Sequence, residues 1–111
     1  MFKIIRKNEA VLRKVSGEKI VLNLVSKEIT KDVSLAVTET TEVFKEKEVC
    51  QNNRIYYILD GNFEIKINGQ PEIIETGDSC FISKGTEYEM NGVFRAVVVN
   101  QPAFGVQALK I

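Results

Sequence analysis

The side chains best suited to bind a ligand lie on two β-type runs of the sequence. In the run RIYYILDG, the two-residue period of a strand places Arg54 and Tyr56 on one face. After Gly85, the same period places Tyr88 and Met90 on one face. A guanidinium forms paired hydrogen bonds with carboxylate and phosphate groups. We therefore expect Arg54 to suit an anionic ligand, in a mostly apolar cavity that also holds phenol groups.

Residue types and motifs that the sequence lacks exclude several kinds of catalytic and binding site. The sequence contains no histidine, so neither a Ser/His/Asp nor a Cys/His nucleophile can be built. The commonest protein ligand of first-row metals is absent for the same reason. Neither a GxGxxG pattern nor a Walker-type glycine–lysine pattern occurs, which excludes these phosphate-cradling loops. The sequence thus argues against most hydrolase and oxygenase activities.

Size and charge exclude other classes of partner. A chain of 111 residues fits one domain with its own core. Its 15 basic and 15 acidic residues balance, which argues against nucleic acid or an anionic membrane as a partner. No apolar run approaches the roughly 20 residues of a membrane span, and the first run breaks too early for a secretory signal. We expect a cytoplasmic protein whose Cys50 and Cys80 are reduced.

Turn-forming dipeptides divide the chain into short segments with strand periodicity, and no long amphipathic helix intervenes. This spacing predicts a sandwich or barrel of antiparallel strands. We expect a single domain over residues 1–111, with N-terminal strands in 1–32, a barrel core in 33–104 and a tail in 105–111 that ends as a strand or a docked turn. The expected turns are Asp60-Gly61, Asn68-Gly69, Thr76-Gly77-Asp78, Lys84-Gly85 and Asn91-Gly92.

The order of these motifs resembles that of the cupin superfamily over roughly residues 33–104. Gly61 stands at the close of the first cupin motif. The second motif is matched at Gly77, Ser83, Gly85, Tyr88 and Gly92. The resemblance implies an all-β fold, the double-stranded β-helix (cupin or jelly-roll barrel), and it implies a homodimer, since cupins of this size are often dimers.

The positions that carry metal ligands in many cupins hold other residues here. Arg54 stands where the family has a glutamate, and Tyr88 stands where it has the last histidine. Depending on the spacing, the paired histidine positions are taken by Glu48 and Cys50 or by Lys47 and Val49. A permanent cation at Arg54 opposes a metal cage, so we expect no metal and no cofactor. The resemblance is closest to a histidine-poor group of single-domain cupins, in which a Pro-Ala-aromatic triplet, here Pro102 to Phe104, follows the last core strand.

Two interpretations of these residues remain open. If the cupin register holds, the barrel interior forms a ligand site from Arg54, Tyr56, Tyr88, Glu48, Cys50 and Met90. Alternatively, Arg54 pairs with Glu48 inside the barrel as a structural replacement for the metal. On the other face of the same strand, Ile55, Tyr57 and Leu59 predict cover by the N-terminal segment or by another subunit.

The sequence therefore favours a cupin-fold protein that binds a small molecule, anionic or sugar-like, without a metal. One alternative is a metal-independent enzyme of the isomerase or epimerase type, which needs a general acid and base. The second alternative is a structural or protein-interaction barrel with no small ligand.

Overall fold

A computed structural model describes residues 1–41 and 44–106, and the C-terminal end of the predicted tail, residues 107–111, lies outside the described residues. The described residues form one 3-10 helix and eight strands. Their bounds are η1 Lys7–Glu9, β1 Val11–Lys14, β2 Lys19–Val25, β3 Ser34–Thr40, β4 Phe44–Val49, β5 Asn53–Ile67, β6 Gln70–Glu75, β7 Ser79–Ile82 and β8 Glu87–Gln101. Within this part of the chain, no helix is long and apolar enough to cross a membrane.

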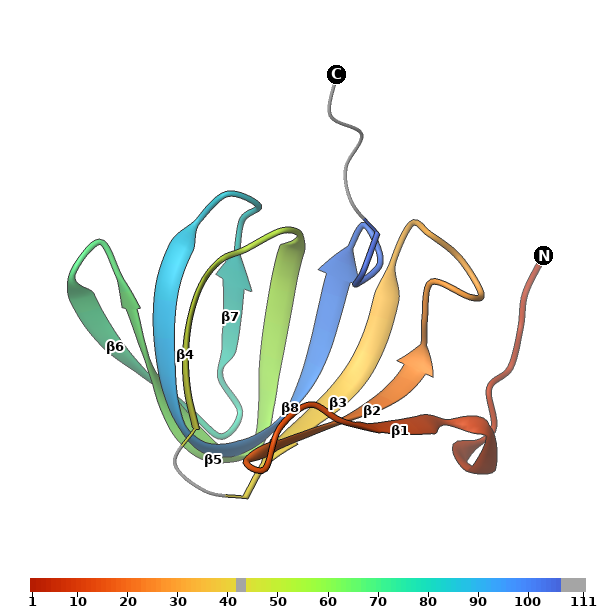
Figure 1. Ribbon diagram of the computed structural model, residues 1–111, viewed down its shortest axis with the longest axis horizontal. Helices are drawn as coiled ribbons and strands as arrows, with labels where there is room; N and C mark the ends of the chain where they lie inside the picture. The colour runs from red at the N-terminus through yellow and green to blue at the C-terminus, as the bar shows by residue number, and fades with distance from the viewer. Residues whose placement is uncertain (42–43, 107–111) are drawn as a thin grey trace.

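The strands form one antiparallel sheet that curves around a core. Its order is β1-β2-β3-β8-β5-β6, with β4 paired to β8 and β7 paired to β5. The two long strands β5 and β8 pair along nearly their whole length. β3 and β4 pair with different halves of β8, and β7 and β6 with different halves of β5. Figure 1 shows the two long strands bending as they cross the base of the molecule. This architecture confirms the predicted all-β, double-stranded β-helix.

The core forms from alternate residues of the strands. In β5, for example, Arg54, Tyr56 and Ile58 are buried while Ile55 and Tyr57 are exposed, as a two-residue period requires. The buried cluster consists of Phe44, Cys50, Tyr56, Ile58, Phe63, Ile65, Ile82, Tyr88, Met90, Phe94, Ala96 and Val98. This alternation directs the polar residues of the same inward faces toward the barrel interior.

Two predicted hairpin turns were wrong. Asp60-Gly61 lies inside the continuous strand β5, and Asn91-Gly92 lies inside β8. At both places the strand bends against its neighbour: a Cβ on Gly61 would lie 2.9 Å from the Cα of Phe94, and a Cβ on Gly92 would lie 2.6 Å from the Cα of Phe63. Glycine therefore permits the close approach of two backbones at these bends. The turns predicted at Asn68-Gly69, Thr76-Gly77-Asp78 and Lys84-Gly85 fall between strands, as expected.

The N-terminal strands extend the sheet at its edge. β1 pairs with β2, and β2 pairs with β3. Arg13 of β1 and Lys19 and Asn23 of β2 line a cavity next to residues of β3 and β8. This part of the chain thereby contributes to the interior of the barrel.

Candidate ligand-binding site

Arg54 lies near the start of β5 and points into the barrel, where three side chains hold it. Its Nε donates to Oδ1 of Asn100 at 2.7 Å, and its NH1 donates to Oε1 of Glu48 at 2.6 Å and to the phenol oxygen of Tyr88 at 2.8 Å. The Arg54 residue is only 6% exposed. These hydrogen bonds engage Nε and NH1, and within residues 1–41 and 44–106 the NH2 group donates to no other side chain or carbonyl.

The register of the sheet explains how these groups meet. Glu48 of β4 and Tyr88 of β8 are direct cross-strand partners, and Arg54 of β5 is the partner of Asn100 of β8. Directly opposed residues of antiparallel strands bring their side chains within contact distance on one face. The Tyr88 hydroxyl also donates to Glu48 Oε1.

Strand β4 resolves the two alignments that the sequence left open. Glu48 faces the interior, whereas Lys47 and Val49 lie on the exposed face of the strand. The interior face also carries Glu46, two residues earlier. The structure thus brings Glu48, rather than the pair Lys47 and Val49, to Arg54 and Tyr88.

The remaining predicted site residues lie in two environments. Tyr56 lines the inner cavity beside Arg54. Cys50 is a free, buried thiol that contacts the carbonyl oxygen of Asn52 at 3.1 Å, and Met90 packs within the apolar cluster. Cys50 and Met90 therefore contribute to the core, and neither lines the cavity next to Arg54.

The inner cavity next to Arg54 has a volume of about 130 Å³. The sequence analysis did not propose several of the lining residues as site residues: Arg13, Lys19, Asn23, Ser34, Thr38, Glu46, Asn100 and Phe104. Strand alternation in β4 and β8 was a usable signal for Glu46 and Asn100, since each lies two residues from an inward-facing residue. No local pattern pointed to Lys19, because only the pairing of β1, β2 and β3 brings it to the cavity.

Burial shifts the pKa of Tyr88 and of three groups that line the cavity, Tyr56, Lys19 and Glu46. Burial raises the pKa of Tyr56 to about 12 and also raises the pKa of Tyr88, so both phenols are neutral and can donate hydrogen bonds. Burial likewise lowers the pKa of Lys19 and raises the pKa of Glu46. Lys19 Nζ lies 3.9 Å from Oε2 of Glu46, and this oxygen accepts no hydrogen bond from any described residue. The cavity thus contains a second, loosely engaged pair of charges.

The residues at this site do not fit a metal ion. The Glu48 carboxylate already accepts hydrogen bonds from Arg54 and Tyr88, and a guanidinium cation occupies the place where a metal cage needs negative charge. Within residues 1–41 and 44–106, no group of three or more His, Cys, Asp or Glu side chains is placed to hold a metal. The donor set instead suits a ligand that carries its own negative charge.

Comparisons with known proteins identify the fold. No protein-family model matches the sequence, and neither does any curated protein. The structure is similar to solved structures of KdgF from Halomonas sp. (13% identity, 95% of this chain and 97% of that chain, TM-score 0.80) and of an RmlC-like cupin from Shewanella frigidimarina NCIMB 400 (11% identity, 95% of each chain, TM-score 0.80). It is also similar to a variant of Streptomyces PAC13 with uridine (14% identity, 99% of this chain and 95% of that chain, TM-score 0.76). The chain therefore has the cupin fold.

Proposed function

We propose that this protein binds a small molecule, anionic or sugar-like, inside its barrel without a metal ion. The observation that carries the proposal is the Arg54 guanidinium. Glu48, Tyr88 and Asn100 hold its Nε and NH1 groups, and its NH2 group donates no hydrogen bond to another described residue. A donor fixed in this way loses little conformational entropy when an anion binds. Because Arg54 lines the inner cavity, a ligand in this cavity can reach its guanidinium group.

The charge of the cavity supports an anionic ligand over a neutral or cationic one. Its lining contains three cations, Arg13, Lys19 and Arg54, and two carboxylates, Glu46 and Glu48. Glu48 is already engaged by Arg54 and Tyr88. Three cations against two carboxylates leave a net positive charge facing a ligand.

The comparison structures lend a general precedent for a small ligand in this fold. A PAC13 variant was solved with uridine, and the present barrel has the same fold.

The Lys19–Glu46 pair favours a second candidate, a metal-independent enzyme of the isomerase or epimerase type, because a carboxyl group with a raised pKa is suited to proton transfer. Conversion of a bound anion into a product would distinguish this enzyme from a binding protein.

The proposal is tested by titrating chelator-treated protein with inorganic phosphate, followed by NMR chemical shifts and calorimetry. We expect saturable binding that weakens as salt is added, because the attraction is electrostatic. Arg54→Lys should weaken binding about tenfold or more, since an ammonium keeps the charge but not the planar fork.

The matched control is Lys47→Met, which removes a cation from the exposed face of β4 and should leave phosphate affinity unchanged. Binding that requires an added divalent metal would contradict the proposal. A complete lack of phosphate binding at millimolar concentration would favour the structural barrel, in which Arg54 only replaces a metal.

A further inference from the structure

A second cavity adjoins the inner one, and the two share a wall. The outer cavity has a volume of about 550 Å³ and lies between the N-terminal residues, the segment after β2 and the segment after β8. Four residues line both cavities: Arg13, Asn23, Ser34 and Phe104. A molecule that occupies the inner cavity and extends outward therefore passes these four side chains.

Phe104 is the large apolar member of this shared wall, and its backbone is anchored. Its amide donates to Oγ of Ser34 at 2.9 Å, and the preceding amide, of Ala103, donates to the carbonyl oxygen of Lys31 at 3.0 Å. Asn52 Nδ2 donates to the carbonyl oxygen of Pro102 at 2.9 Å. The Phe104 residue nevertheless remains 49% exposed. An exposed ring on a fixed backbone is a preorganised apolar surface.

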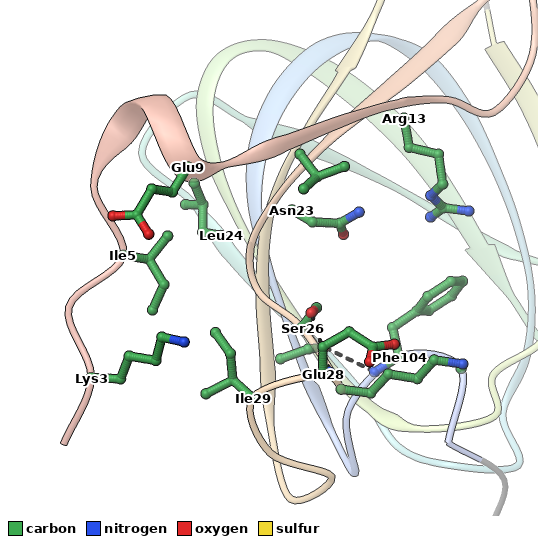
Figure 2. Close-up of a pocket in the computed structure, with 14 residues that line it drawn as sticks. Lys3, Ile5, Glu9, Arg13, Asn23, Leu24, Ser26, Glu28, Ile29 and Phe104 are labelled. Atoms are coloured by element: carbon green, nitrogen blue, oxygen red, sulfur yellow. Dashed lines mark hydrogen bonds between the residues drawn. The ribbon is translucent and has the colours of Figure 1, made fainter. Parts of the chain in front are cut away.

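The Phe104 ring is also flanked by the two guanidinium groups of the cavities. The Cζ atom of Arg13 lies 5.3 Å from the ring centroid, and that of Arg54 lies 6.0 Å from it. Figure 2 shows the Arg13 side chain pointing toward the Phe104 ring at one end of the outer cavity, with Lys3, Ile5 and Glu9 at the other end. An anionic group bound at Arg54 would thus have its adjoining atoms next to this ring.

The sizes of the cavities indicate what kind of ligand fits both. Pockets for small organic ligands usually measure about 300–1,000 Å³, so the inner cavity of about 130 Å³ holds a head group alone. The outer cavity reaches the usual size and includes the apolar side chains of Ile5, Leu24 and Ile29. It thereby offers room and apolar surface for the rest of a molecule.

We propose that the ligand is an amphipathic anion that spans both cavities, with its anionic group on Arg54 in the inner cavity and a ring-shaped apolar body on Phe104 in the outer cavity. This inference rests on the proposed function, because it takes the anion site at Arg54 as given. It adds the class of the ligand. It also assigns to Phe104 the contact with the apolar body, which makes the complete ligand bind more tightly than its anionic group alone.

The test compares inorganic phosphate with phenyl phosphate, which carries the same kind of head group and adds a ring. We expect phenyl phosphate to bind the wild-type protein about tenfold more tightly, the advantage expected of aromatic stacking plus apolar contact. Phe104→Ala should abolish this advantage, so that the ratio of the affinities for phenyl phosphate and inorganic phosphate falls to about one. Phe81→Ala is the matched control, since Phe81 is 63% exposed on β7 and lines neither cavity.

The outcomes separate this inference from the proposed function. Equal affinity for the two probes, or an equal loss of both in Phe104→Ala with an unchanged thermal melting curve, would overturn the two-cavity ligand while leaving the anion site in place. Failure of both probes to bind wild-type protein would overturn the anion site as well. A ring advantage that survives Phe104→Ala would show that the body of the ligand lies elsewhere.

Discussion

The position of Arg54 meets the geometric requirements of both interpretations that the sequence left open. Arg54 forms the internal ion pair with Glu48, as the structural interpretation requires, and it also borders the cavity that the ligand interpretation requires. A buried ion pair is a weak source of net stability, but removal of one partner leaves the other charge unpaired. The unfolding free energy that an Arg54 variant loses therefore measures the structural role of this residue. The anion affinity that the variant loses measures its proposed role in binding.

We expect Arg54→Met to destabilise the fold by roughly 3 kcal/mol, because the partly buried Glu48 loses its cation. The double variant Arg54→Met/Glu48→Leu should recover most of this loss, since it leaves no unpaired carboxylate. Urea unfolding measures both values. The exposed pair of Lys47 and Glu87, 3.8 Å apart, is the control, and Lys47→Met should cost no more than about 1 kcal/mol. A double variant no more stable than Arg54→Met would contradict a coupled pair.

The long strands β5 and β8 show how the elements position the site. Each bends at a glycine that opposes a phenylalanine backbone on the other strand, with Gly61 facing Phe94 and Gly92 facing Phe63. The Phe63 and Phe94 rings pack in the core with their centroids 4.8 Å apart. These bends let one pair of strands serve both halves of the barrel, so that Arg54 and Tyr88 reach the same interior.

Gly61→Ala should destabilise the protein by roughly 3 kcal/mol, because the new Cβ meets the backbone of the neighbouring strand and the residue has φ +82°. Gly77→Ala is a matched control, with φ +89° and no atom within 4 Å of the added Cβ, so it carries only the conformational cost of about 1–2 kcal/mol. Thermal and urea unfolding of the two variants give the comparison. Equal costs would show that backbone approach at the bend is unimportant.

The same two glycines explain why the sequence predicted the strand pattern but misplaced two turns. Asp-Gly and Asn-Gly favour tight turns wherever positive φ is needed, and this local preference is the same at Asn68-Gly69, a real turn, as at Asp60-Gly61, a bend. The difference arises from β8, which pairs with β5 on both sides of the bend. A pairing between distant residues, such as Gly61 with Phe94, has no local signature in the sequence.

The whole barrel presents an apolar outer face on one side. Ile55 is the cross-strand partner of both Phe81 and Val99, and Val99 is the partner of Leu35, so four apolar side chains form a row across β7, β5, β8 and β3. Ile55, Tyr57 and Phe81 are 43%, 46% and 63% exposed. The N-terminal strands β1 and β2 lie at the sheet edge beside β3. Of the two covers that the sequence allowed, a second copy of the chain is the one we propose.

We expect the protein to form a homodimer through this face, with about twice the chain mass of 12.5 kDa in solution. Tyr57→Glu should shift the protein toward the monomer, because Tyr57 lies on the same exposed face as Ile55, two positions along β5, and the change places a charge there. Sedimentation equilibrium measures the change. Ile73→Glu is the control, since Ile73 is 54% exposed on β6, away from this row. A wild-type protein that is monomeric at every concentration would contradict the dimer.

Strand periodicity, turn residues and the absence of histidine were sufficient to predict an antiparallel sandwich or barrel, the shared face of Arg54 and Tyr56, and the exclusion of histidine-based catalysis. These features depend on neighbours one or two positions away, so a single sequence shows them directly. Long-range pairing was needed to decide that Glu48, and not Lys47 and Val49, faces Arg54 and Tyr88. It was also needed to bring Lys19 and Phe104 to the cavity and to join the predicted short segments into β5 and β8. Such pairing depends on the packing of the complete chain, which the local pattern of residues does not contain.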